Sequence, residues 1–493
     1  MNQTLFQFFH WYYSTEGNLW NHAADQAERL ASLGVTQVWL PPAYKSALGA
    51  AEPGYAVYDL YDLGEFDQKG TVRTKFGTKA EYLDCIKKMQ ASGIKVLADI
   101  VLNHKHGGDE KETITIRRVN PHNRKEFIAG DETIECFTKF VFPGRKGQYS
   151  QFVWDQHSFT GVQLEDGGIG MVLNEWSNGQ WDEMLEEELG NFDFLMGNDI
   201  EYRNPAVREE LKQWGKWYVE TTGVDGFRLD ALKHISPAFY PEWLYYLNQQ
   251  FRKNFFCIGE YWQNNINALV NYLNVTAGVI QLFDVPLHYN FHLASNNRQD
   301  YDIRRLFDNT LVKARPELAI TFVDNHDTQP LQSLESTVDY WFKPLAYAVI
   351  LLREQGIPCV FYPAVYEAKY TDNKNGQDIY VEMNKITDIE EMMRVRARLA
   401  YGMQRDYFDH EHIAGWTREG KQGEPASGCA VLISNGPGGE KKMSMGKAHA
   451  GQQFRAVCGG RGETVQLNEE GEGLFFVNEM TAAVWINVDA INL

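Results

Sequence analysis

Three acidic residues, Asp230, Glu260 and Asp327, come at or shortly after the end of a short apolar run in the sequence. A buried strand that ends in this way places an ionisable group where the strand meets solvent. Carboxyl groups held together can act as a general acid, a general base or a nucleophile. The pattern therefore predicts an active site built on acid–base or nucleophilic chemistry.

Asp230 alone would be a weak indication, because it could cap the next helix or simply pair with Arg228. The pattern recurs, however, at intervals of about 30 and about 65 residues, which match one and two strand–helix units of an eight-unit barrel at roughly 30 residues each. Active sites of such barrels lie at the C-terminal ends of the strands. The three carboxylates are therefore predicted to converge.

The elements that must position these residues alternate between apolar strands and amphipathic helices. Predicted helices cover 20–33 and 205–222, and Thr78 with Glu81 forms a capping box ahead of another helix. Parallel strands are predicted at 5–9, 35–40, 94–102, 255–260, 279–284, 319–324 and 357–362, and one more begins the stretch from Gly226 to His234. Eight such strands alternating with helices predict an α/β fold, the (β/α)8 TIM barrel.

The alternation is interrupted once and stops near residue 400. The interruption is rich in charge, glycine and aromatic residues, with short strand signals at 113–119 and 134–141, and it indicates a subdomain inserted after the third strand. Short runs punctuated by glycine then predict a C-terminal antiparallel β-sandwich domain. The predicted domains are the barrel at 1–104 and 204–398, the inserted subdomain at 105–203 and the C-terminal domain at 399–493.

Composition narrows the function further. A chain of 493 residues with 44% hydrophobic residues has enough apolar material for two or three folded domains. Its formal charge of −19 would repel nucleic acid and anionic membranes, and no apolar run reaches membrane-spanning length. We therefore expect no nucleic-acid partner and no membrane partner.

The cellular location is predicted from two features that the sequence lacks, a signal peptide and paired cysteines. The N-terminal residues lack a basic segment, a clean apolar core and a cleavage site, so they do not resemble a signal peptide. Six cysteines lie far apart without paired spacing, which favours reduced thiols over disulfides or a zinc site. We expect a cytoplasmic monomer, although the mature form of an exported protein would have a similar N-terminus.

Four ordered sequence blocks carry a resemblance to a known family. They are Asp99-Ile100-Val101-Leu102-Asn103-His104, Gly226 to His234, Gly259-Glu260-Tyr261-Trp262, and Phe322 to Asp327. In these blocks, and nearly from end to end, the chain resembles α-amylases of glycoside hydrolase family 13, especially the bacterial liquefying-type and intracellular branch. The resemblance implies endo-hydrolysis of α-1,4-glucosidic bonds in starch, glycogen or maltodextrins.

The resemblance also implies residue roles. Asp230 would be the nucleophile, Glu260 the general acid/base, and Asp327 the third carboxylate that holds the distorted sugar. Substrate contacts would come from Tyr55, His104, Arg228, Lys233, Trp262 and His326. From the residues alone, the histidines could be structural, the aromatic rings could belong to the core, and Lys233 could lie in the first turn of a helix.

Glycosidic cleavage requires two carboxyl groups in different environments. Arg228 is expected to keep Asp230 ionised, while burial and nearby negative charge keep Glu260 protonated near neutrality. In a retaining mechanism the two groups stand about 5 to 5.5 Å apart. We expect retention of the α anomer.

One calcium ion between the inserted subdomain and the barrel is also implied by the resemblance. Its oxygen ligands would be Asn103, Asp193, Asp199 and the backbone carbonyl of His234. Without the resemblance, the two aspartates could belong to a solvated acidic loop. Thermostable relatives carry further metal-binding aspartates where this chain has Thr160, Glu201 and Arg203, and a guanidinium cannot bind a cation. A second calcium or a sodium is therefore not expected.

Two alternative functions stay open. A family relative could mainly transfer glucosyl units or cut α-1,6 bonds, and the continuous liquefying-type match speaks against this. A catalytically silent barrel could bind carbohydrate or a protein partner, but all three carboxylates are present. A barrel hydrolase with a catalytic metal is disfavoured, because the histidines do not have ligand spacing.

Overall fold

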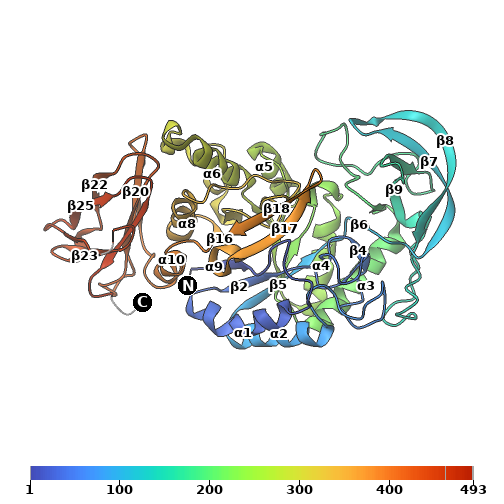
Figure 1. Ribbon diagram of the computed structural model, residues 1–493, viewed down its shortest axis with the longest axis horizontal. Coiled ribbons are helices and arrows are strands. Elements are labelled where there is room, and N and C mark those ends of the chain that lie inside the picture. Colours follow the sequence, from blue (N-terminus) through green and yellow to red (C-terminus); the bar gives the residue numbers. More distant parts are fainter. Residues whose placement is uncertain (1, 461, 491–493) are drawn as a thin grey trace.

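The computed structural model describes residues 2–460 and 462–490 and arranges them as three units in a row (Figure 1). A barrel occupies the centre, the sheet inserted after the third barrel strand lies at one end, and the C-terminal sheets lie at the other. Among the described residues, no helix combines the length and apolar character needed to cross a lipid bilayer.

Eight parallel strands close the central barrel. They are β1 (Leu5–Gln7), β2 (Gln37–Leu40), β5 (Lys95–Ile100), β12 (Gly226–Leu229), β13 (Phe256–Gly259), β14 (Gln281–Phe283), β15 (Ala319–Phe322) and β16 (Ile357–Phe361). Strand β1 pairs with both β2 and β16, which completes the ring. The strands are almost wholly buried because helices cover their outer side. The predicted TIM barrel is confirmed.

The barrel helices lie around the strands. They include α1 (Leu19–Ser32), α2 (Lys79–Ala91), α3 (Pro205–Thr222), α4 (Phe239–Phe251), α5 (Ile266–Val275), α6 (Val285–Asn297), α7 (Leu311–Ala314), α8 (Lys343–Leu352), α9 (Tyr362–Tyr366) and α10 (Ile389–Arg398). The predicted capping box opens α2: the Thr78 side chain accepts from the Glu81 backbone, and the Glu81 carboxylate accepts from the Thr78 backbone. These bonds satisfy N–H groups that have no partner within the helix.

The inserted segment forms a six-stranded sheet in the order β6-β11-β9-β10-β7-β8. Its strands are β6 (His104–Lys105), β7 (Glu110–Asn120), β8 (Asn123–Lys139), β9 (Phe159–Gln163), β10 (Ile169–Val172) and β11 (Asn198–Ile200). The β7–β8 hairpin is longer than the predicted strands at 113–119 and 134–141. The outer strand β8 is mostly solvent-exposed and polar, so its sequence lacks the apolar signal of a buried strand.

Two antiparallel sheets make up the C-terminal unit. The larger contains β19 (Gln404–Tyr407), β20 (Ile413–Arg418), β21 (Cys429–Ser434), β26 (Ala482–Asn487), β23 (Gln453–Cys458) and β24 (Thr464–Gln466). The smaller pairs β22 (Gly439–Ser444) with β25 (Glu472–Val477). Leu432 and Trp485 of the first share a core with Met443 and Phe475 of the second, which is the packing of the predicted β-sandwich.

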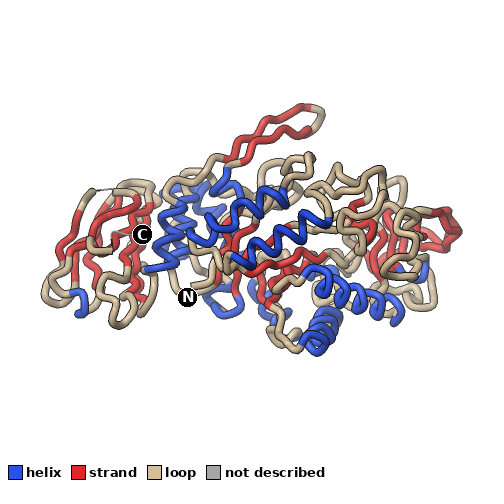
Figure 2. The backbone as a smooth tube through the Cα atoms, turned by 90° about the horizontal axis from the view of Figure 1, so that it is seen from below, coloured by secondary structure: helices blue, strands red, loops and turns tan. Residues whose placement is uncertain are grey.

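Two hairpins in loops at the C-terminal ends of barrel strands were not predicted. In the long loop after β2, β3 (Lys45–Ser46) pairs with β4 (Val57–Asp59). After β16 and α9, β17 (Ala368–Lys374) pairs with β18 (Gln377–Met383), and this hairpin projects from the barrel (Figure 2). Both hairpins lie on the rim where barrel enzymes carry their active sites.

Candidate active site

A single buried arginine at the C-terminal rim of the barrel joins two of the predicted carboxylates. Nη1 of Arg228 lies 2.6 Å from Oδ1 of Asp230, and Nη2 lies 3.3 Å from Oε2 of Glu260. Asp327 is close enough that its charge raises the pKa of Glu260. The structure therefore brings the three strand-end carboxylates of the sequence analysis into one site.

The local sequence of β12 explains this arrangement. Arg228 and Asp230 are two residues apart on an extended chain, so their side chains point to the same side. Ala231 then adopts φ 52°, which ends the strand, and its N–H donates to Oε2 of Glu260 at 3.1 Å. Leu232–His234 form a 3₁₀ turn, so Lys233 does not lie in the first turn of an α-helix.

Burial separates the acid strengths of the three groups. It raises the pKa of Glu260 to about 8, assisted by the charges of Asp230 and Asp327, although Arg228 lowers it. It raises the pKa of Asp327 to about 7. Burial also raises the pKa of Asp230, but Arg228 opposes that rise from the shorter distance of 2.6 Å. Glu260 is thus suited to hold a proton near neutral pH, and Asp230 to be ionised.

A fourth carboxylate, Asp99, was missed by the sequence analysis as a site residue. It lies fully buried on β5 and accepts hydrogen bonds from Arg228 Nη1 (2.9 Å), Trp39 Nε1 (2.9 Å) and the Tyr55 hydroxyl (2.7 Å). Burial raises its pKa to about 6. The available signal was an isolated acid inside the apolar run 94–102.

Stacked rings line one side of the site. The Tyr55 ring stacks on His326 with centroids 5.0 Å apart and on Trp11 at 5.5 Å. Nδ1 of His326 lies 3.1 Å from Nε2 of Gln7 on β1. Trp11 and Gln7 were not identified from sequence, because only the closed barrel brings the end of β1 to the same rim as the end of β15, with β16 between them.

Both predicted site histidines are neutral groups here. Nε2 of His104 lies 2.9 Å from the carbonyl of Tyr55, and burial lowers the pKa of His104 to about 4. Burial and the nearby Arg228 charge lower the pKa of His326 well below its ordinary value, and its Nε2 lies 3.3 Å from Asp327. Neutral imidazoles can donate hydrogen bonds to hydroxyl groups without adding charge.

Two predicted substrate contacts have protein partners in this structure. Lys233 pairs with Glu188 of the inserted segment, and its Nζ lies 4.8 Å from the centre of the Phe192 ring. Trp262 is partly buried and packs near Phe322, with ring centroids 6.3 Å apart. Contact of either residue with a substrate stays a prediction.

Three of the predicted calcium ligands, Asn103, Asp193 and Asp199, lie close together where the inserted segment joins the barrel. Asn103, Asp193 and Asp199 are each 1% exposed, and Oδ1 of Asn103 is buried without a hydrogen-bond partner. Oδ1 of Asp199 lies 3.5 Å from the Asn103 amide. Burial, reinforced by neighbouring acidic charge, raises the pKa of both aspartates well above the usual range. Buried carboxylates with an orphaned amide oxygen fit a hard cation.

Among the described residues, the cluster around Asp193 and Asp199 has too few acidic side chains to hold a metal by themselves. Within residues 2–460 and 462–490, no group of three or more His, Cys, Asp or Glu side chains is placed to hold a metal, so any site depends on amide and backbone oxygens. Arg203 lies beside it and binds Glu201 through Nη2 at 2.6 Å and Nε at 2.7 Å. The Glu201 carboxylate is thus already neutralised by a side-chain cation.

Comparisons with known proteins agree with this geometry. The family model described as "Alpha amylase, catalytic domain" matches residues 20–423. The chain is 47% identical to an α-amylase of Geobacillus stearothermophilus, covering 98% of this chain and 87% of the relative. It is 45% identical to the cytoplasmic α-amylase of Escherichia coli, covering 99% and 100%. A crystal structure of an α-amylase from Geobacillus thermoleovorans complexed with acarbose aligns with a TM-score of 0.64 at 18% identity over 98% of both chains, which supports the fold.

Proposed function

The chain belongs to the α-amylase family, and from this premise we propose that it hydrolyses internal α-1,4-glucosidic bonds of starch, glycogen or maltodextrins with retention of configuration. The observation that carries the assignment to this site is the shared guanidinium of Arg228, which contacts Asp230 at 2.6 Å and Glu260 at 3.3 Å. Two carboxyl groups of unequal acidity beside each other are what retaining cleavage requires.

We assign the first step to Glu260 and Asp230. Protonated Glu260 gives its proton to the glycosidic oxygen while the Asp230 carboxylate bonds to the anomeric carbon, and the leaving sugar departs with that proton. The pKa of about 8 for Glu260 supports its role as the acid. Glu260, now ionised, then takes a proton from water, which attacks the anomeric carbon and releases Asp230.

The remaining site residues orient the sugar. Asp327 and the neutral His326 are suited to bind hydroxyl groups of the distorted ring, and Tyr55 offers an aromatic face to it. His104 is proposed to line the same subsite while its Nε2–H donates to the Tyr55 carbonyl. Lys233 and Trp262 are proposed to contact the sugar on the leaving side. For Lys233, this contact would compete with its present pairing to Glu188.

We also propose one calcium ion at Asn103, Asp193, Asp199 and the backbone carbonyl of His234. When bound, it would neutralise the buried carboxylates and fasten the inserted segment to the barrel, so its contribution is structural. The orphaned Oδ1 of Asn103 supports this site. The Glu201–Arg203 pair favours a single ion over several.

A cytoplasmic location is proposed on the name of the relative from Escherichia coli, which covers 99% of this chain. Glycogen or imported maltodextrin would then be the natural substrate, and a monomer is the expected form.

The test is a time course of fragment lengths from maltoheptaose blocked at its non-reducing end, with Asp230→Asn beside the wild type. Early internal cuts that vanish in the variant are expected. Products longer than the substrate would indicate a transferase. A folded, calcium-loaded wild type that cuts nothing would favour a carbohydrate-binding protein.

A further inference from the structure

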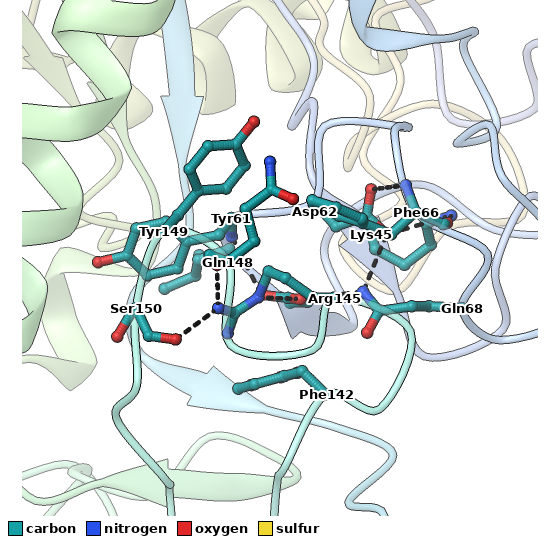
Figure 3. A network of polar contacts seen from close by, with 12 residues as sticks. Lys45, Tyr61, Asp62, Phe66, Gln68, Phe142, Arg145, Gln148, Tyr149 and Ser150 are labelled. Atoms are coloured by element: carbon teal, nitrogen blue, oxygen red, sulfur yellow. Dashed lines mark hydrogen bonds and ion pairs between the residues drawn. The ribbon is translucent and has the colours of Figure 1, made fainter.

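A buried polar network connects the loop after β2 to the inserted segment (Figure 3). Nε of Arg145 donates to Oδ2 of Asp59 at 2.9 Å, and its Nη1 donates to the carbonyls of Gln148 (2.6 Å) and Ser150 (2.9 Å). Arg145 is 3% exposed and Asp59 is 1% exposed. The guanidinium therefore fixes Asp59 to the backbone of the inserted segment.

The network continues into the loop that contains β3 and β4. Nε2 of Gln68 bridges Asp59 (2.9 Å) and Asp62 (3.0 Å). Nζ of Lys45 lies 3.4 Å from Asp62 and donates to three loop carbonyls, with Thr71 and Val72 at 2.6 Å each. Every charged side chain in this chain of contacts has a buried partner, which favours a single conformation of the loop.

Strand β4 carries this constraint to the active site. Asp59 is its last residue, and Tyr55 lies four residues earlier in the same segment. The carbonyl of Tyr55 lies 2.9 Å from His104 Nε2, and the carbonyl of Val57 accepts from the His106 backbone at 2.7 Å. One end of a five-residue segment thus contacts Arg145, and the other presents the Tyr55 ring to His326.

We propose that Arg145 is a positioning residue of the active site, which fixes the Tyr55 ring through Asp59 and β4. Arg145 itself contacts the Phe142 and Tyr61 rings and the groups named above. Its role rests on the proposed function, because Tyr55 matters only if a sugar binds beside it.

The chemistry of the Arg145–Asp59 pair favours a role in positioning over a role in stability alone. Burying a salt bridge seldom adds net stability compared with apolar residues of the same volume, whereas it can specify one geometry. A guanidinium also donates in a fixed planar fork, so it sets direction as well as distance. Lysine keeps the charge but cannot reach a carboxylate and two carbonyls in that geometry.

The test is a double-mutant cycle on maltoheptaose cleavage with Arg145→Lys, Tyr55→Ala and the double variant. If Arg145 acts through the Tyr55 ring, Arg145→Lys raises KM about 3- to 10-fold, as expected for a misplaced aromatic contact, and changes kcat little. In the Tyr55→Ala background, the same change leaves KM within about twofold. An equal rise in both backgrounds, or no rise in either, would overturn the proposal.

A matched control separates kinetics from stability. Arg353, itself buried, makes a bidentate ion pair with the exposed Asp406 (2.7 and 2.9 Å) toward the C-terminal sheet. Arg353→Lys should lower the melting temperature without raising KM. If Arg145→Lys does not fold, Asp59→Asn replaces it, and the same dependence of KM on Tyr55 is expected. An inert wild type would refute the proposed function, whereas an active wild type with unchanged KM in Arg145→Lys and Asp59→Asn would refute only the positioning role.

Discussion

Arg228 and Asp99 are register partners on the adjacent strands β12 and β5, and Nη1 of Arg228 donates to Oδ1 of Asp99 at 2.9 Å. The same nitrogen binds Asp230 at 2.6 Å. Asp99 thus fixes the Arg228 guanidinium that also binds Asp230. Asp99 also orients Tyr55, because it accepts a hydrogen bond of 2.7 Å from the Tyr55 hydroxyl.

Replacing Asp99 should damage stability and activity together. Asp99→Asn removes one of the two carboxylates on Nη1 of a fully buried guanidinium, while Asp230 keeps the other. The cost in folding free energy should therefore stay below the cost of about 3–5 kcal/mol for a buried charge left without a partner. Unfolding in denaturant and kcat/KM for maltoheptaose measure the two effects. Asp84, in an exposed ion pair with Lys88, provides the control: Asp84→Asn should change neither stability nor kcat/KM. Wild-type stability in Asp99→Asn would contradict this account.

The pH profile should have two limbs. Glu260 must be protonated to act as the acid, so kcat/KM is expected to fall as pH rises through its pKa of about 8. Asp230 must be ionised, so activity falls at low pH toward a pKa that lies above its ordinary 3.8.

A variant tests the origin of the alkaline limb. The charge of Asp327 raises the pKa of Glu260. The residual activity of Asp327→Asn should therefore decline at a lower pH than that of the wild type. A limb that stays in place would mean that another group controls it.

Calcium removal should lower the melting temperature and one equivalent should restore it. A ligand at 100 times its Kd stabilises the folded state by about 2.7 kcal/mol, which is the scale of the expected loss. Asp199→Asn should melt early and no longer respond to a chelator. Asp166, an aspartate with a 59% exposed side chain, is the control, and Asp166→Asn should respond as the wild type does. Bound metal of two or more equivalents would contradict the single site.

The proposed mechanism fixes the configuration of the product. In it, two inversions at the anomeric carbon, first by Asp230 and then by water, give net retention. NMR of the first product released should therefore show the α anomer before mutarotation. An initial β anomer would require a water between the carboxylates and would exclude Asp230 as nucleophile.

The capping box of α2 offers a stability test away from the site. Thr78→Ala removes the side-chain acceptor for the Glu81 backbone and should cost about 1 kcal/mol. Glu81→Gln keeps an acceptor for the Thr78 backbone and should cost less. Activity should be unchanged in both, and denaturant unfolding provides the comparison.

The barrel could be predicted because its strands are buried on both sides and appear as apolar runs. The β7–β8 and β17–β18 hairpins could not be delimited in this way, since their apolar residues include exposed ones, such as Ile128 (61%) and Tyr380 (62%), among polar and charged residues. Their shape depends on pairing between the two strands, and the apolar pattern of a single strand carries little of that information.

Contacts in the active site that depend on how strands or segments pair could not be predicted from the sequence either. Asp230, Glu260 and Asp327 could be located from strand ends, because parallel strands end on one rim. The partnership of Asp99 with Arg228 depends on the register of β5 against β12, which the sequence does not specify locally. The pairing of Lys233 with Glu188 likewise depends on how the inserted segment folds back over the barrel.

The number of protons bound in the active site matters as much as the shape of the site. The site contains four carboxyl groups, those of Asp99, Asp230, Glu260 and Asp327. One guanidinium cannot balance four ionised carboxylates, and His104 and His326 are neutral. A glucan carries no charge that could balance the excess of carboxylates, so some of these carboxyl groups must keep protons taken up from the solvent. The site therefore meets its substrate already loaded with the proton that the first bond cleavage consumes.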